Sequence, residues 1–178
     1  MHTRPVAPRD YPAITDILNH EIASGVAHFG TEPQTLEQTR EQFDKLGTRY
    51  PAYAAQLDDH PDARTIGFCK SGPWNPRGAY AWSVEITVYV DHAHHRQGVG
   101  RALYAALVPD LRARGFRTML AGVTLPNPAS VALHESLGMR RAALFPDVGY
   151  KHGKWRSVAY WTMDLNPVAQ DRALPQPC

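Results

Sequence analysis

The chain has 178 residues, of which 43% are hydrophobic and 20% charged, a balance typical of one globular domain with a substantial core. A formal net charge of +2 argues against nucleic-acid binding, and two cysteines argue against a disulfide scaffold. No apolar run approaches the length of about 20 residues that spans a bilayer, and no apolar leader is present, so no membrane role and a cytoplasmic location are expected.

The first 46 residues are predicted to form a short strand at 3–6 and helices at 12–24 and 35–46. Apolar residues recur on one face of the first helix, at Ile14, Ile17, Leu18 and Ile22. Between the helices, GVAHFGTEP at 25–33 breaks this periodicity. This segment either covers a pocket with Phe29 or is an ordinary surface connection.

Two antiparallel strands are expected next, at residues 53–57 and 65–70, separated by a polar turn. They lead into the irregular loop SGPWNPRG at 71–78, which contains Trp74 and Arg77. The Arg77 guanidinium either holds a carboxylate substrate through paired hydrogen bonds or is simply solvated.

The stretch from Trp82 to Tyr104 organises the rest of the chain. Residues 82–90 alternate between apolar and polar, which is typical of a strand, and Glu85 is on the polar face. Gly98-Val99-Gly100 then opens a helix that is expected to continue to Arg114. Exposed amides at a glycine-rich helix start suit a phosphate, although the same pattern also makes a tight turn.

The remaining elements are a strand at 117–123, a helix that follows Asn127 and reaches Leu137, and strands at 139–145 and 157–165. The segment GYKHGKWR at 149–156 is expected to join the last two strands. Residues 1–165 thus form one domain, and 166–178 form a Pro-rich tail too poor in apolar residues to fold. Three histidines, His92, His94 and His95, are interpreted as solvated, so no metal is expected.

The order strand, glycine loop, helix, strand, asparagine loop, helix resembles the GNAT acyltransferases. Several motifs are similar to the phosphinothricin N-acetyltransferase and methionine sulfoximine acetyltransferase group: NHEI at 19–22, FGTEPQ at 29–34, GPW at 72–74, AYAWSVEITVYV at 79–90, LPN at 125–127, LHESLG at 133–138 and KHGKW at 151–155. The resemblance covers residues 2–165. It implies an α/β fold with a central, mixed, mostly antiparallel sheet of about seven strands flanked by about four helices.

The resemblance also implies acetyl-CoA as the co-substrate. Its pantetheine arm would pair with the backbone of Val88, Tyr89 and Val90. Its pyrophosphate would rest on Arg96, Gln97, Gly98, Val99, Gly100 and Arg101, with Asn127 also in contact. One departure is His95, which stands where the superfamily usually has Gln or Arg; a neutral histidine can donate only one hydrogen bond to a phosphate.

Two side chains are candidates for the chemistry. Glu85 is the candidate base that takes the proton of the acceptor amine, and its alternative role is an ion pair with Arg77 or Arg117. The resemblance implies that His134 protonates the departing thiolate, whereas its alternative role is packing against the sheet. A strand amide such as that of Val88 would stabilise the oxyanion.

The resemblance implies small α-amino acid substrates, such as phosphinothricin, methionine sulfoximine or methionine sulfone. The implied substrate-binding residues are Phe29, Arg77, Gly78, Ala79 and Thr87. Two other functions remain open, an acetyltransferase of protein N-termini or lysines and a non-catalytic acetyl-CoA sensor. By resemblance the protein is a homodimer.

Overall fold

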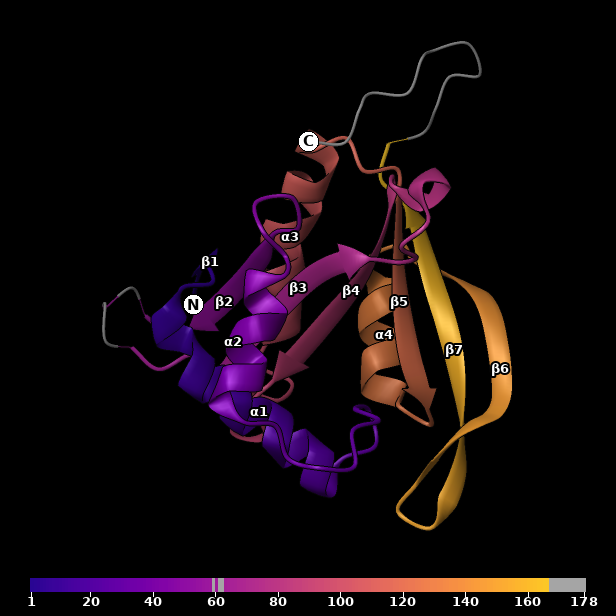
Figure 1. The fold of residues 1–178 in the computed structure, drawn as a ribbon, viewed down its shortest axis with the longest axis horizontal. Coiled ribbons are helices and arrows are strands. Elements are labelled where there is room, and N and C mark those ends of the chain that lie inside the picture. The colour runs from indigo at the N-terminus through magenta and orange to yellow at the C-terminus, as the bar shows by residue number, and fades with distance from the viewer. Residues whose placement is uncertain (59, 61–62, 167–178) are drawn as a thin grey trace.

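The computed structural model describes residues 1–58, 60 and 63–166, and in it helices cover both faces of a twisted sheet (Figure 1). The strands are β1 (His2–Pro5), β2 (Ala52–Gln56), β3 (Gly67–Pro73), β4 (Ser83–Val90), β5 (Thr118–Leu125), β6 (Arg140–Lys151) and β7 (Lys154–Asp164). The helices are α1 (Tyr11–Ser24), α2 (Leu36–Asp44), α3 (Val99–Ala113) and α4 (Pro128–Ser136). Short 3₁₀ turns occur at η1 (Pro8–Asp10), η2 (Gly78–Tyr80) and η3 (His92–His94).

The described strands form one seven-stranded sheet in the order β1-β2-β3-β4-β5-β7-β6. Every neighbouring pair is antiparallel except β4 and β5, which run parallel. A parallel pair needs a crossover connection, and here the crossover contains α3. The expected mixed, mostly antiparallel sheet with four flanking helices is therefore confirmed.

The central strands β4 and β5 separate partway along their length. They pair only at Ser83↔Thr118, Val84↔Met119 and Glu85↔Leu120. Beyond these pairs β4 stays paired to β3 as far as Val90, and β5 stays paired to β7 as far as Leu125. Two strand edges that do not pair with each other therefore face one another across an opening in the middle of the sheet.

Two apolar clusters hold the helices to the sheet. The larger cluster packs α3 against the sheet and includes Leu103, Tyr104, Leu107, Leu111, Val84, Ile86, Met119 and Trp161. The smaller cluster packs α1 and α2 on the opposite face and includes Ile14, Ile17, Leu18, Phe43 and Phe68. Burying each such side chain contributes about 1.5–3 kcal/mol, so the apolar faces recognised in the sequence position both layers.

The β6–β7 hairpin differs from the sequence prediction. Residues 149–156 were expected to be a connection, but they are mostly strand, with pairs Gly149↔Arg156, Tyr150↔Trp155 and Lys151↔Lys154. Only His152 and Gly153 form the turn, and their φ angles are 50° and 71°. Two positive φ angles match the twist of a hairpin, so this short turn suffices to reverse the chain.

None of the helices in the described part of the chain is long and apolar enough to cross a membrane. The predicted tail extends beyond Asn166, and its residues 167–178 lie outside the described residues.

Candidate active site

The Glu85 side chain lies at the point where β4 and β5 separate. Glu85 pairs with Leu120 in the last register position shared by the two strands, and directly paired residues project to the same face of a sheet. Leu120 lines the large cavity described below, so the carboxylate belongs to the cavity face. Within residues 1–58, 60 and 63–166 the carboxylate forms no salt bridge, so the alternative ion pair with Arg77 or Arg117 is not seen.

The hydrogen-bond partner of Glu85 is Tyr160 of β7, a residue that the sequence did not suggest. The Tyr160 hydroxyl donates to Glu85 Oε1 at 3.0 Å across 75 residues of chain. Burial, together with the negative charge of Glu85, raises the pKa of Tyr160 to about 12, so the phenol stays protonated. No local pattern reveals this contact, because it joins two strands that are distant in sequence.

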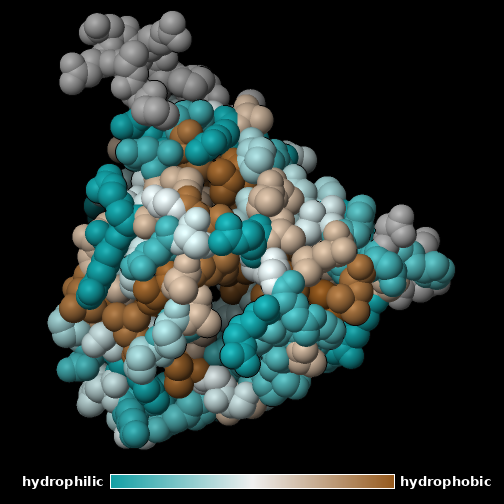
Figure 2. Space-filling model, turned by 180° about the vertical axis from the view of Figure 1, so that it is seen from behind, coloured by the Kyte–Doolittle hydropathy of each residue, from teal (hydrophilic) through white to brown (hydrophobic). Residues whose placement is uncertain are grey.

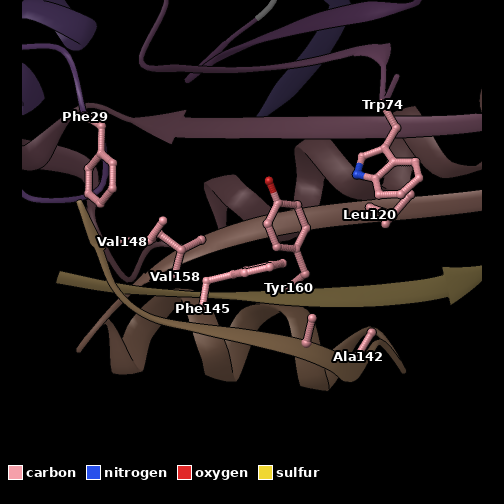
Figure 3. A pocket seen from close by; sticks show the side chains of 9 residues that line it. Phe29, Trp74, Leu120, Ala142, Phe145, Val148, Val158 and Tyr160 are labelled. Carbon is pink, nitrogen blue, oxygen red and sulfur yellow. The ribbon is translucent and has the colours of Figure 1, made fainter. Parts of the chain in front are cut away.

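A cavity of about 550 Å³ opens beside this pair, on the same face of the sheet (Figure 3). Its walls come from the 25–33 loop, the end of β3 and strands β5, β6 and β7: Phe29, Trp74, Leu120, Ala142, Ala143, Phe145, Val148, Val158 and Tyr160. Phe29 and Trp74 stand at opposite ends of the cavity, with Tyr160 between them (Figure 3). The lining is apolar apart from the tyrosine hydroxyl and the indole nitrogen.

The face opposite to that seen in Figure 1 is also hollowed near its centre (Figure 2). Apolar side chains gather around this hollow, and hydrophilic side chains surround them.

Phe29 covers one end of the cavity, as one of the two interpretations of its loop predicted. The loop is tied to the β6–β7 hairpin by Lys151, which is 5% exposed. The Lys151 ammonium donates to the carbonyl oxygen of His28 at 2.6 Å and to that of Glu21 at 3.3 Å. Phe29 also lies against Gly149, where a Cβ atom would come within 2.1 Å of the ring.

The other predicted substrate-binding residues are divided between two places. Thr87 is half-buried on the Glu85 face of β4. Arg77, Gly78 and Ala79 are exposed around η2 and do not line the cavity. The structure therefore brings Phe29 and Thr87 to the Glu85 face and leaves the Arg77 segment in solvent.

The expected anion loop leads directly into α3. Gly98 is the N-cap, with a φ of 84°, and no atom lies within 4 Å of the place where a Cβ would be. This left-handed conformation favours glycine, and it leaves the first amides of α3 uncovered. Gly100 has a different role, since a Cβ there would lie 2.8 Å from Leu133 Cδ2, and its absence lets the Leu133 side chain of α4 pack closely against the start of α3.

The polar side chains of this loop mostly bond within the protein. The His95 ring donates from Nε2 to the Val90 carbonyl at 3.0 Å, and Gln97 donates to the Ala93 carbonyl at 3.2 Å. Arg101 donates to the Ser136 hydroxyl at 2.9 Å. Backbone amides, with the Arg96 and Arg101 charges nearby, are therefore the groups that fit a phosphate.

Asn127 is the N-cap residue of α4, and His134 lies within this helix. Asn127 Oδ1 accepts a hydrogen bond from the Ser130 amide at 3.1 Å, so this side chain caps the helix. His134 is 3% exposed, with Nδ1 2.6 Å from the Ser130 carbonyl and Nε2 2.7 Å from the Tyr104 hydroxyl. Tyr104 belongs to the α3 cluster, so His134 lies on the opposite side of the sheet from Glu85.

A family model described as the acetyltransferase (GNAT) family matches residues 14–139. The chain belongs to the GNAT acetyltransferase family. It is accordingly an acyltransferase whose co-substrate is acetyl-CoA.

GNAT relatives match nearly the whole chain. A phosphinothricin N-acetyltransferase from Streptomyces viridochromogenes is 40% identical over 169 residues, which cover 95% of this chain and 90% of the relative. A methionine sulfoximine and methionine sulfone acetyltransferase from Salmonella typhimurium is 30% identical over 172 residues, with 95% of each chain covered. These relatives confirm the resemblance to this group that the motifs indicated.

Solved GNAT structures have the same fold. An N-acetyltransferase from Staphylococcus aureus superposes with a TM-score of 0.87 at 28% identity, covering 93% of this chain and 98% of that one. A phosphinothricin acetyltransferase from Sinorhizobium meliloti, solved with acetyl-CoA, has a TM-score of 0.86 at 29% identity, covering 92% and 87% of the two chains. Together with the family match, these structures support the GNAT assignment.

Proposed function

We propose that this GNAT enzyme moves the acetyl group of acetyl-CoA to the amino group of a small amino acid or amino-acid analogue. Relatives named for phosphinothricin and for methionine sulfoximine and sulfone support this substrate class. The observation that carries the proposal is the position of Glu85, whose carboxylate lies where β4 and β5 separate and accepts a hydrogen bond from Tyr160, a residue that lines the apolar cavity. A carboxylate at that position is suited to remove a proton from an amine.

Acetyl-CoA supplies an activated acetyl group as a thioester. The β4 edge formed by Val88, Tyr89 and Val90 would hold its pantetheine arm, because this edge does not pair with β5. The amides at Gly98, Val99 and Gly100 would hold the pyrophosphate, with Arg96, Gln97 and Arg101 around them and Asn127 on the adjacent helix. The uncovered start of α3 supports this placement.

Glu85 would act as the base. An α-amino group has a pKa of about 7.7–8.0, so most of the acceptor arrives as an ammonium ion at pH 7. Glu85 Oε2 takes its proton, and the free amine attacks the acetyl carbonyl carbon. The Val88 amide is our candidate donor to the carbonyl oxygen as negative charge develops there.

His134 would return a proton to the leaving thiolate. Burial lowers the pKa of the imidazole, so His134 is neutral at rest. It would first take up the second proton, which the amine nitrogen loses once it has bonded to the acetyl carbon, and then pass that proton to the thiolate. A thiolate whose thiol has a pKa of about 8.5 is a suitable acceptor. Glu85 as the base and His134 as the acid would then act from opposite faces of the sheet. The acetyl group would pass directly from acetyl-CoA to the amine, without a covalent acyl-enzyme.

The acceptor would sit with its side chain in the apolar cavity under Phe29. Thr87 shares the Glu85 face and would donate its hydroxyl hydrogen to a polar group of the substrate. Arg77, Gly78 and Ala79 remain the residues proposed to hold the carboxylate of an amino acid, although in this structure they lie exposed outside the cavity lining. Excluding water beneath the aromatic ring would strengthen these polar contacts.

A homodimer is also proposed, through the β6–β7 hairpin. This hairpin exposes a group of large apolar side chains: Leu144, Phe145, Val148, Tyr150 and Trp155. Such a contiguous apolar surface is typical of a protein interface. A second copy placed there would also enclose the cavity, because Phe145 and Val148 line it. The molar mass in solution, measured by light scattering, tests this proposal.

A substrate panel tests the proposed function. Release of free thiol from acetyl-CoA would be measured with phosphinothricin, methionine sulfoximine, methionine sulfone, the ordinary amino acids and short peptides. Turnover with one or more of the small amino acids supports the proposal. Turnover of peptides alone would instead identify a protein N-terminal or lysine acetyltransferase. Tight acetyl-CoA binding with no thiol release from any amine would identify a sensor.

A further inference from the structure

We propose that Tyr160 is a positioning residue for Glu85, holding one oxygen of the carboxylate so that the other faces the acceptor amine. The inference rests on the proposed role of Glu85 as the base. It assigns a role in the reaction to a β7 side chain that neither the motifs nor the strand pattern indicated.

The first observation is the hydrogen bond itself. The Tyr160 hydroxyl donates to Glu85 Oε1 at 3.0 Å, while within the described chain Oε2 has no hydrogen-bond donor. The bond spans β7 and β4, although β5 lies between these two strands in the sheet. Tyr160 therefore reaches across the opening and fixes which oxygen remains available.

The second observation is the packing that holds the Tyr160 ring. Tyr160 pairs with Gly122 of β5, and a Cβ at Gly122 would lie 3.2 Å from Tyr160 Cζ. The ring of Phe145 meets the Tyr160 ring edge-on, with centroids 6.0 Å apart at 87°. Because Gly122 has no side chain, the phenol lies flat against β5, with its hydroxyl pointing away from β7 (Figure 3).

The third observation is the protonation state of the phenol. The pKa of Tyr160 is raised to about 12, so the hydroxyl donates at every pH at which the enzyme would be assayed. A hydrogen bond from a phenol to an ionised carboxylate is shorter and stronger than one between neutral groups. Tyr160 is thus a permanent donor that orients Glu85.

The test is how Tyr160→Phe divides its effect between kcat and the two KM values. We expect kcat to fall by about tenfold, because the carboxylate is no longer held in place, while the KM for acetyl-CoA does not change. Gly122→Ala should lower kcat in the same way, since the added methyl group presses on a hydroxyl-bearing ring that is still present.

Tyr53→Phe is the matched control. Its hydroxyl donates to Asp110 Oδ2 at 2.9 Å, which is the same kind of bond at nearly the same length, between β2 and α3. This variant should lose thermal stability as Tyr160→Phe does, but its kcat should match that of the parent. An equal loss of kcat in both variants would contradict a specific role for Tyr160.

Glu85→Gln separates this inference from the proposed function. If Glu85→Gln is inactive and Tyr160→Phe keeps the kcat of the parent, the positioning role is wrong and the base role stands. If Glu85→Gln turns over normally, the base role is wrong, and the positioning role falls with it. If Glu85 is the base and Tyr160 positions it, the double variant Glu85→Gln/Tyr160→Phe should be no slower than Glu85→Gln alone.

Discussion

The Tyr104 hydroxyl lies 2.7 Å from His134 Nε2, inside the core between α3 and α4. The other ring nitrogen, Nδ1, is 2.6 Å from the Ser130 carbonyl, which can only accept a hydrogen bond. Nδ1 must therefore carry the proton, and Nε2 accepts from Tyr104. The resting imidazole is neutral, which agrees with the lowered pKa that burial gives it.

This pair predicts a pH-dependent stability. The lowered pKa of His134 means that the unfolded chain binds a proton below about pH 6.5 while the folded chain does not. The free energy of unfolding should therefore be fully retained above that pH, and it should fall as the pH drops toward the folded-state pKa, by at most about 1.4 kcal/mol per pH unit. Denaturant titrations between pH 5 and 8 measure this free energy of unfolding.

Two variants isolate the contribution of His134. His134→Gln should flatten the pH dependence, whereas His92→Gln, whose side chain is 62% exposed, should leave it as in the parent. His28 also has a lowered pKa, so some slope should remain in both variants. An unchanged slope in His134→Gln would show that this histidine is not the titrating group.

Glu85→Gln should lower kcat by about 10² or more, the scale of lost general-base catalysis. The affinity for acetyl-CoA should be preserved, because the carboxylate lies on the face proposed for the amine. Initial rates by thiol release and calorimetric titration with coenzyme A measure the two quantities. Glu41→Gln, on the exposed face of α2, is the control, and parent-like turnover of Glu85→Gln would remove Glu85 from the base role.

Gly149→Ala should displace Phe29, because the new methyl group would lie 2.1 Å from the ring carbon Cε2. We expect the KM for the acceptor to rise about three- to tenfold, with little effect on the KM for acetyl-CoA, because one wall of the cavity moves. Phe29→Ala provides the reference. If Gly149 acts only through Phe29, Gly149→Ala should add nothing in the Phe29→Ala background.

Gly98→Ala should destabilise the fold by about 1–2 kcal/mol, the cost of a left-handed conformation for a residue with a Cβ. No neighbouring atom opposes the methyl group, so the φ of 84° is the only cause. Gly72→Ala has equally open surroundings without a positive φ, and it should cost clearly less. Thermal unfolding compares the two, and equal losses would contradict the explanation.

The local sequence was sufficient to predict most of the elements and the face of β4 on which Glu85 lies. The apolar spacing in α1 predicted which face is buried, and the alternation in 82–90 predicted that Glu85 projects away from Val84 and Ile86. The glycine loop was predicted to begin a helix, and α3 does begin at Val99. These successes share a cause, because helix and strand periodicities depend only on neighbouring residues.

The longer strands of the hairpin were missed, because cross-strand pairing extends them. Tyr150 and Trp155 lie in a segment that looks like a loop, yet they pair with each other, and their rings pack edge to face at 5.3 Å. Aromatic pairs across strands stabilise a hairpin, and this stabilisation depends on the partner strand rather than on either segment alone.

The sequence by itself determined most of the helices and strands, including those that carry the candidate residues Glu85 and His134, since these elements follow from short-range spacing. Only the tertiary structure decided that β4 and β5 separate after Glu85 and that Tyr160 forms a hydrogen bond to Glu85 across 75 residues of chain. It also decided that His134 lies on the opposite face of the sheet from Glu85. The physical reason is that strand order and side-chain packing are fixed by contacts between distant segments, which leave no periodic pattern in the chain.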